Sequence, residues 1–185
     1  MRVIAGKCRH LPLKTPDGPD TRPTTDRIKE TLFNILQPDI PGAYFLDLFS
    51  GSGGIGIEAL SRGAAFCCFA EQNRAALRCI RENLSFTSLE GQAQVIAGDA
   101  CMAVKRLPSG MVFDIVFMDP PYDRGLEIRV MDSFRDAPCV HEGTLFIIEA
   151  ALKTDFSWTE DSPWEISRVK TYKTNKHVFL RAASK

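Results

Sequence analysis

A glycine-rich segment between an apolar run and a helical pattern constrains the fold of this chain more than any other feature. Within Phe45–Gly56, the residues Gly51, Gly53 and Gly56 have the spacing G-x-G-x-x-G. This spacing is typical of a turn from a buried strand into a helix, where glycines permit a tight turn and a close backbone approach. Glu71 follows Gly51 by twenty residues, the distance at which an acid can hold two ribose hydroxyls. The segment predicts a nucleoside site in an α/β fold.

The chain beyond residue 40 alternates short apolar runs with helical patterns. We expect strands at 43–48, 65–70, 94–97, 112–118 and 144–149, and helices at 55–62, 73–84 and 126–134. Such alternation predicts a parallel sheet with helices on both faces. Two further runs, 164–172 and 176–182, flank Lys173-Thr174-Asn175 and predict a C-terminal β-hairpin. Together these elements predict a Rossmann-like fold with a mostly parallel seven-stranded sheet.

The first 36 residues depart from this alternation. Two strand-like pieces, 2–5 and 10–14, are separated by Gly6, and a proline-containing stretch leads to a helical pattern over 25–36. Thr24 is one of the candidate caps of that helix. We predict one domain over residues 1–185. In it, residues 1–36 form an N-terminal extension with a small hairpin and a helix, and residues 37–185 form the core that carries the chemistry.

Charge is unevenly distributed along the chain. The 23 Lys+Arg balance the 23 Asp+Glu, and a net charge of zero taken alone argues against a nucleic-acid binder. Residues 1–36, however, carry a net charge of +3 and residues 164–185 a net charge of +5, whereas residues 37–163 carry −8. The two basic ends are where we expect nucleic-acid phosphates to bind.

The cysteines and histidines predict no metal site. The six cysteines form no C-x-x-C pair, and the adjacent Cys67 and Cys68 suit neither a metal site nor an easy disulfide. We interpret the cysteines as small buried apolar residues in a reducing compartment. The chain begins without a signal-peptide pattern and has no apolar run of transmembrane length. We therefore expect a soluble cytoplasmic protein that is not associated with a membrane.

The acids near the glycine-rich segment favour one kind of nucleoside cofactor. Asp47 precedes the glycines at the end of its strand, where a carboxylate repels a pyrophosphate but attracts an ammonium group. Asp99 and Ala100 follow the third strand, where they are placed for an adenine amino group. With Glu71 they predict S-adenosylmethionine, which has no phosphate and carries an adenine, a ribose diol and a cationic methionine moiety. A nicotinamide-dependent oxidoreductase is the alternative, and titration with NAD would detect it.

A second motif, Asp119-Pro120-Pro121-Tyr122, directly follows the fourth strand, where open α/β sheets hold ligands. An exocyclic amine is a poor nucleophile because its lone pair is delocalised. Hydrogen bonds from the amine to the Asp119 carboxylate and the Pro120 carbonyl would localise that lone pair. Pro121 has no N–H to compete for these acceptors, and Tyr122 offers a ring on which a flipped base can stack. Asp119, Pro120 and Tyr122 are therefore the candidate catalytic residues.

These motifs resemble a known family. The segment Asp47–Gly53 and the motif Asp119–Tyr122 are similar to those of class I S-adenosylmethionine-dependent amino-methyltransferases. Arg22-Pro23-Thr24 with the following segment 27–36, the opening segment 2–7, and Glu58–Ala64 resemble the bacterial 16S rRNA guanine-N2 methyltransferases of the RsmD type. The resemblance extends from residue 1 to about residue 182.

The resemblance implies transfer of a methyl group to N2 of one guanosine in 16S rRNA, within an assembled or nearly assembled 30S particle. We expect no obligate protein partner. Cofactor binding maps onto Asp47, Ser50, Gly51, Gly53, Gly56, Glu71, Asp99, Ala100 and Thr24. The stretch from Arg22 to Thr24 would close over the methionine end of the cofactor, near the incoming RNA. The candidate RNA contacts are Arg22, Arg2, Lys7, Lys173 and Lys176.

Other functions are compatible with the same motifs. The Asp-Pro-Pro-Tyr motif also serves adenine-N6 methylation of DNA or RNA, and relatives with Asn at its first position methylate glutamine in proteins. A DNA enzyme usually needs a recognition domain, for which 185 residues leave little room. A non-catalytic RNA-binding module with a methyltransferase fold would have no need to keep both the acidic residues and the complete catalytic motif.

Overall fold

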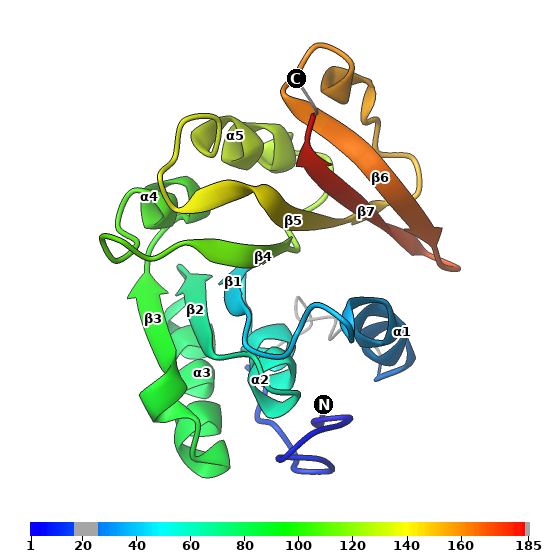
Figure 1. Ribbon diagram of the computed structural model, residues 1–185. Coiled ribbons are helices and arrows are strands. Elements are labelled where there is room, and N and C mark those ends of the chain that lie inside the picture. The colour runs from blue at the N-terminus through cyan, green and yellow to red at the C-terminus, as the bar shows by residue number, and fades with distance from the viewer. Residues whose placement is uncertain (17–25, 184–185) are drawn as a thin grey trace.

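The computed structural model describes residues 1–16 and 26–183, which form a seven-stranded sheet with helices on both faces (Figure 1). The strand order is β3-β2-β1-β4-β5-β7-β6. The strands are β1 Tyr44–Leu48, β2 Phe66–Glu71, β3 Ala93–Ala97, β4 Phe113–Met118, β5 Val140–Ala151, β6 Trp164–Thr171 and β7 Asn175–Ala182. Strands β1 to β5 pair in parallel, and β7 lies antiparallel between β5 and β6. The predicted α/β fold and its mostly parallel seven-stranded sheet are confirmed.

The helices cover the two faces of the sheet unequally. They are α1 Asp26–Leu36, α2 Gly54–Ser61, α3 Arg74–Thr87, α4 Ala100–Val104 and α5 Leu126–Ser133, with 3-10 turns η1 Glu90–Gln92 and η2 Ser157–Thr159. Helices α1, α2 and α3 lie on the same side of the sheet as the N-terminus, and α4 and α5 lie on the other side (Figure 1). Helix α4 was not predicted, because five residues are too few to show a helical period.

Two hydrophobic cores fill the space between the sheet and these helices. Because neighbouring side chains of a strand point to opposite faces, Phe45 packs with the core under α1–α3, whereas Leu46 packs with the core under α4 and α5. The same alternation separates the buried thiols of Cys67 and Cys68. Burial raises the pKa of both thiols, that of Cys68 to about 12, so neither is a reactive thiolate at neutral pH.

The predicted N-terminal hairpin is present in a minimal form. One antiparallel bridge joins Arg2 to Pro12, and the N–H groups of Val3 and His10 donate to the carbonyl oxygens of Leu11 and Val3. Between these arms the backbone bonds to α2: the N–H groups of Ile4 and Ala5 donate to the Glu58 carboxylate. The pairing stays short because a backbone donor bonded to α2 is not available to a facing strand.

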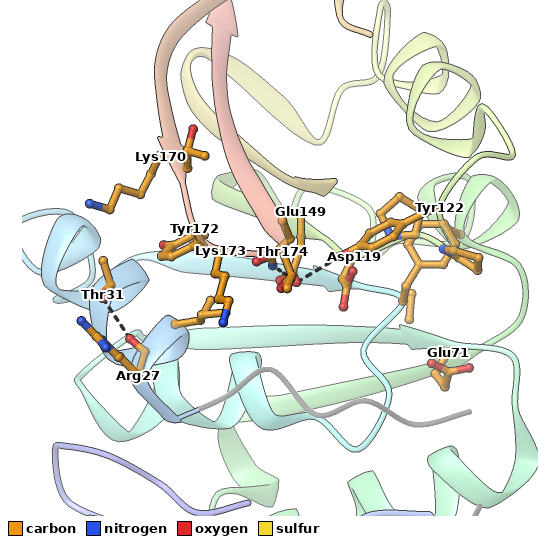
Figure 2. A pocket seen from close by; sticks show the side chains of 18 of the residues that line it. Arg27, Thr31, Glu71, Asp119, Tyr122, Glu149, Lys170, Tyr172, Lys173 and Thr174 are labelled. Atoms are coloured by element: carbon orange, nitrogen blue, oxygen red, sulfur yellow. Dashed lines mark hydrogen bonds between the residues drawn. The ribbon is translucent and has the colours of Figure 1, made fainter. Parts of the chain in front are cut away.

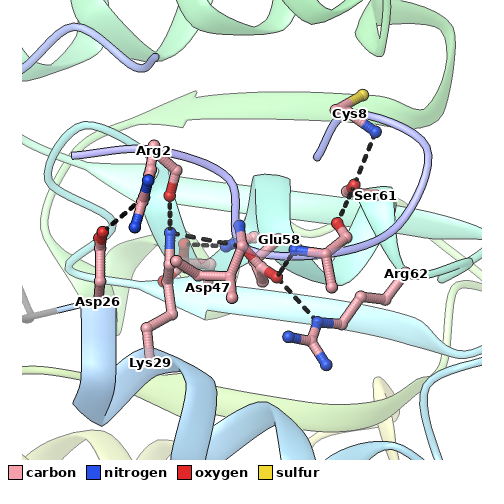
Figure 3. Close-up of polar contacts among 11 residues, drawn as sticks. Arg2, Cys8, Asp26, Lys29, Asp47, Glu58, Ser61 and Arg62 are labelled. Atoms are coloured by element: carbon pink, nitrogen blue, oxygen red, sulfur yellow. Dashed lines mark hydrogen bonds and ion pairs between the residues drawn. The ribbon is translucent and has the colours of Figure 1, made fainter. Parts of the chain in front are cut away.

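A buried charge cluster joins this segment, α1 and α2 (Figure 3). Lys29 and Glu58 are both fully buried, and the Lys29 Nζ lies 3.4 Å from the Glu58 Oε2. Arg62 Nε lies 2.8 Å from the Glu58 Oε1, and the Lys29 ammonium also donates to the carbonyl oxygen of Arg2. Burial lowers the pKa of Lys29 while the charge of Glu58 opposes that shift. The cluster therefore fastens the N-terminal segment to the core.

Residues 1–16 and 26–183 contain neither a membrane-spanning helix nor a cluster of potential metal ligands. None of their helices is both long and apolar enough to cross a membrane. These residues also contain no group of three or more His, Cys, Asp or Glu side chains arranged to hold a metal ion. The single-domain boundaries, with an extension over 1–36 and a core over 37–185, stay a prediction.

Candidate active site at the carboxyl ends of the strands

A cavity of about 920 Å³ opens at the carboxyl ends of the parallel strands. In the sheet order, β2 lies on one side of β1 and β4 on the other, which is the switch point where open α/β sheets bind ligands. In Figure 2, Glu71 lies on one side of the cavity, Asp119 and Glu149 lie in the middle, and Arg27 and Lys170 lie on the opposite side. The volume is in the range of cofactor and small-molecule sites.

The glycine loop brings α2 close to β2 beside this cavity. Gly53 has a φ of +81°, in the left-handed region that favours glycine, and it precedes α2 without a side-chain cap. The Asp47 carboxylate takes the place of the cap, because its Oδ2 accepts the N–H of Gly56 at 2.9 Å. A Cβ on Gly56 would lie 2.3 Å from the ring of Phe69. The last glycine of the motif is therefore required by helix–strand packing.

Asp47 is 1% exposed and is not among the residues that line the cavity. Burial raises its pKa to about 7, the bond from Gly56 opposes this shift, and the charge of Glu71 adds to it. Ser50 holds the same turn, because its hydroxyl donates to the carbonyl oxygen of Asp47 at 2.6 Å. The glycine loop thus holds a carboxyl group beneath the cavity wall, in a buried place where its ionised form is unfavourable.

Glu71 ends β2 with its carboxylate held by three backbone donors. Its Oε2 accepts the N–H of Gly51 at 2.9 Å, and its Oε1 accepts the N–H groups of Gln72 and Asn73, each at 2.8 Å. A carboxylate has about four acceptor positions. The Glu71 carboxylate is therefore fixed in orientation, and it can still accept a hydrogen bond from a hydroxyl group of a ligand in the cavity.

The third predicted acid has a different surrounding. Asp99 is the N-cap of α4, since its Oδ1 accepts the N–H of Cys101 at 3.0 Å and that of Met102 at 3.3 Å. Its neighbours Gly98 and Ala100 line the cavity, whereas Asp99 does not. An acid directly after a strand, the pattern that predicted an adenine contact at Asp99, is thus also the pattern of a helix N-cap.

The Asp-Pro-Pro-Tyr motif forms the middle of the cavity wall. The backbone N–H of Asp119 donates to the carbonyl oxygen of Leu48 at 3.4 Å, which ties the motif to the end of β1. Burial raises the pKa of Asp119 well above its ordinary value, and the charges of Glu149 and Asp47 raise it further. Tyr122 is 41% exposed, and its hydroxyl donates to the Glu149 Oε1 at 3.4 Å. An exposed ring therefore stands beside a buried acid.

A buried polar network that was not predicted lies behind Asp119. Glu149 of β5 is 5% exposed and accepts the side-chain amide of Asn175 at 2.5 Å. Its other oxygen lies 3.1 Å from the His177 Nε2, and the His177 Nδ1 lies 3.1 Å from the hydroxyl of Tyr172. Glu149, Asn175 and Tyr172 all line the cavity. The antiparallel register that pairs Glu149 with His177 brings the C-terminal hairpin into the site.

The side of the cavity away from Glu71 is basic. Arg27 of α1, Lys170 of β6 and Lys173 of the hairpin turn line it. Lys176, predicted as an RNA contact, instead donates to the carbonyl oxygen of Thr154 and lies 5.2 Å from the centre of the Phe156 ring.

Two other predicted RNA contacts, Arg2 and Lys7, do not line the cavity. Arg2 pairs with Asp26 at 2.9 Å, and the Lys7 ammonium donates to the Gln92 side chain at 2.6 Å. Arg22 and Thr24 lie outside the described residues.

Six of the predicted site residues meet on the cavity wall. They are Glu71, Ala100, Asp119, Pro120, Tyr122 and Lys173. Others shape the adjoining loops without lining the cavity, namely Asp47, Ser50, Gly51, Gly53, Gly56 and Asp99. The roles assigned to all of them stay predictions. Glu149 was missed although it follows an apolar run directly, as Glu71 and Asp119 do, whereas no local pattern distinguishes Asn175.

Comparison with known proteins agrees with this geometry. The family model described as "Conserved hypothetical protein 95" matches residues 1–181. "Ribosomal RNA small subunit methyltransferase D" of Escherichia coli (strain K12) is 38% identical over 170 residues, which cover 92% of this chain and 84% of that protein. The chain belongs to this family. The family resemblance inferred from the segments around Arg22, Glu58 and Asp119 is confirmed.

Other members of the family extend the comparison. "Putative rRNA methyltransferase YlbH" of Bacillus subtilis (strain 168) is 44% identical over 123 residues, which cover 66% of this chain and 67% of that protein. The solved structure described as "Putative methyltransferase yhhF from Escherichia coli" is 32% identical, with a TM-score of 0.84, and the match covers 100% of this chain and 99% of that one. The fold is the Rossmann-like fold of class I methyltransferases.

Proposed function

We propose that this protein uses S-adenosylmethionine to methylate the exocyclic N2 amine of one guanosine in 16S rRNA, in the cytoplasm. One observation carries the proposal. Asp119 stands in the middle of a cavity that has the Glu71 carboxylate on one side and basic side chains on the other, and Pro120 also lines this cavity. The name of the Escherichia coli relative supports ribosomal RNA as the substrate.

The residues beside the glycine loop fit a nucleoside cofactor without phosphates. Dinucleotide sites use the N-terminal N–H groups of this helix to bind a pyrophosphate. Here the N–H of Gly56 is bonded to the side chain of Asp47, so this donor is not available to a phosphate. Glu71 would hold the ribose diol, Gly98 and Ala100 would border the adenine, and Asp47 would favour the cationic end. This set suits S-adenosylmethionine better than NAD.

The catalytic motif would act on the amine. When bound, S-adenosylmethionine would supply an electrophilic methyl group. The Asp119 carboxylate and the Pro120 carbonyl would accept hydrogen bonds from the two amine hydrogens, orient the nitrogen and localise its lone pair. The nitrogen gains one methyl group and loses one proton, and the raised pKa of Asp119 makes its carboxylate a suitable acceptor for that proton.

The remainder of the wall would hold the RNA. The exposed ring of Tyr122 would stack on the flipped guanine, a contact worth about 1–3 kcal/mol. Arg27, Lys170 and Lys173 would neutralise phosphates on the side away from Glu71. We propose an assembled or nearly assembled 30S particle as the substrate, with no obligate protein partner.

The test incubates the protein and tritiated S-adenosylmethionine with unmodified 30S particles, free 16S rRNA, DNA and protein substrates in parallel. We expect label in 30S particles or 16S rRNA, and nucleoside mass spectrometry should identify it as N2-methylguanosine. Label confined to DNA or protein, or recovery of N6-methyladenosine, would overturn the proposal.

Substitution of the catalytic acid sharpens this test. Asp119→Ala should abolish turnover and leave the affinity for S-adenosylmethionine, measured by calorimetry, close to that of the wild type. Asp39→Ala removes an exposed carboxylate from the loop after α1 and serves as the matched control. Retained turnover in Asp119→Ala would exclude the assigned role of that side chain.

A further inference from the structure

A buried hydrogen-bond acceptor without a partner stands on the cavity wall. Asn175 is 4% exposed and lines the cavity at the start of β7. Its side-chain Oδ1 has no hydrogen-bond partner among residues 1–16 and 26–183. Buried polar atoms are nearly always hydrogen-bonded. An unpaired acceptor at the edge of a binding cavity therefore indicates a donor that belongs to the ligand.

Neighbouring groups fix the direction of this acceptor. The Asn175 Nδ2 donates to the Glu149 Oε1 at 2.5 Å, and an ionised carboxylate can only accept. The amide therefore cannot be reversed without placing its oxygen against the Glu149 oxygen. On its other oxygen Glu149 accepts from the Nε2 of His177, which leaves the Nδ1 to accept from the Tyr172 hydroxyl. This chain of bonds between β5 and the hairpin holds the Asn175 amide in place.

The acceptor lies in a part of the wall that offers oxygen atoms. Asp119 and Glu149 are close enough for the charge of Glu149 to act on Asp119, and Asn175 contacts Glu149 directly. Guanine presents two adjacent donors on one edge, the ring N1–H and the N2 amine. Adenine presents an amine beside an N1 that carries a lone pair. A wall of acceptors therefore matches guanine, and it would place an oxygen against the lone pair of adenine.

We propose that Asn175 determines the base specificity of this site, with its Oδ1 accepting the ring N1–H of the guanine whose N2 amine lies at Asp119. The inference rests on the proposed function and adds a residue to it. Asn175 is a specificity residue that contacts the substrate, while Glu149 and His177 are positioning residues that act through it. A site built to receive an N–H discriminates strongly against an analogue that lacks it, because its buried acceptor is then left unpaired.

The test uses 2-aminopurine, which keeps the amine on C2 but has a lone pair at N1 and lacks the O6 of guanine. The methylated guanosine is first mapped in the wild-type reaction. A 16S rRNA carrying 2-aminopurine at that nucleotide is then made by ligation and assembled into 30S particles. With the wild-type protein, we expect kcat/KM to fall by about 10- to 100-fold relative to guanosine, the loss typical of one buried hydrogen bond. Equal rates on the two bases would overturn the proposal without any variant.

The variant Asn175→Leu removes the acceptor with little change in side-chain size. It should be slower on guanosine by a similar factor and should show a much smaller guanosine-to-2-aminopurine ratio than the wild type, because the bond to N1–H is then absent with both bases. If the ratio in Asn175→Leu equals that of the wild type, the N1–H is bound elsewhere and the proposal is wrong. Unchanged affinity for S-adenosylmethionine verifies that the variant is folded.

A matched control comes from the same hairpin. Ser167→Ala deletes a hydroxyl that donates to the carbonyl oxygen of Phe179 at 3.2 Å, between β6 and β7, and it should keep the wild-type ratio. The two levels of the argument fail differently. If the wild type methylates no guanosine in 16S rRNA, the proposed function fails; if it does but the ratio test gives independent effects, only the role of Asn175 fails.

Discussion

The free energy of unfolding of the wild-type protein should fall between pH 5 and pH 8, and replacement of Asp47 by Asn should remove much of this pH dependence. The carboxyl is 1% exposed, and burial raises its pKa from 3.8 to about 7. The folded protein therefore binds this proton more tightly than the unfolded chain does. The contribution to the free energy of unfolding is fully present below about pH 4 and is lost as pH rises through about 7.

The size of the effect follows from the two pKa values. A shift of one pKa unit corresponds to about 1.4 kcal/mol. As pH rises, the contribution of a carboxyl with a pKa of about 7 in the folded protein to the free energy of unfolding falls by about 4 kcal/mol in total, of which about 2–3 kcal/mol is lost between pH 5 and pH 8. In Asp47→Asn the amide oxygen still accepts the N–H of Gly56, but no proton is titrated. The free energy of unfolding of the variant should therefore depend less on pH by about 2–3 kcal/mol over this range.

Urea unfolding of the cofactor-free protein measures this difference. Unfolding is followed by the fluorescence of Trp158 and Trp164 and by circular dichroism at pH 5, 6, 7 and 8. Asp39→Asn controls for the loss of an exposed carboxylate. Titration of the groups that Asp47 does not influence cancels in the comparison of variant with wild type, whereas the pKa of Asp119 loses the contribution of the Asp47 charge. If the free energies of unfolding of the wild type and Asp47→Asn depend on pH in the same way, the pKa of Asp47 is not raised by its burial.

Three further predictions concern packing, the buried charges and RNA binding. Gly56→Ala should destabilise the protein by about 1–3 kcal/mol or more, because its Cβ would lie 2.3 Å from the Phe69 ring; an unchanged melting temperature would contradict this packing. Glu58→Ala should cost about 3–5 kcal/mol in urea unfolding by leaving Lys29 buried without its counter-charge, and the added change Lys29→Met should restore part of that loss. Lys173→Ala should weaken RNA binding and reduce the magnitude of the slope of log K against log salt by about 0.7–0.9 if this side chain neutralises one phosphate. Filter binding between 50 and 200 mM salt measures the slope. An unchanged slope would show that Lys173 does not contact a phosphate.

The parallel half of the site could be predicted because its signals are local. Glu71 and Asp119 each follow directly after an apolar run, and the carboxyl ends of parallel strands meet at one edge of a sheet. The same rule applies to Glu149, because it directly follows an apolar run and could have been predicted as a site residue in the same way. Asp99 shows the limit of the rule, since a side chain after a strand can also cap the next helix.

The antiparallel half could not be predicted in this way. Asn175 and Tyr172 reach the cavity because β7 pairs with β5 in one particular register, with Glu149 opposite His177. A register between strands that are distant along the chain leaves no periodic trace in either strand. The contacts of the N-terminal segment with α2 could not be predicted for a related reason, because the partners of its backbone donors, Glu58 and Ser61, lie more than fifty residues away.

The order of strands at this edge of the sheet separates the two proposed kinds of recognition along the chain. Glu71, the carboxylate proposed to hold the cofactor, ends β2, whereas Lys173 and Asn175 lie within the single hairpin of β6 and β7. A short contiguous cassette can therefore be exchanged without altering the glycine loop. A chimera that receives residues 170–177 from a relative of different base preference should inherit the preference of the donor and keep the nucleoside affinity of the recipient. The same arrangement would let a family diversify its substrates while its cofactor stays constant.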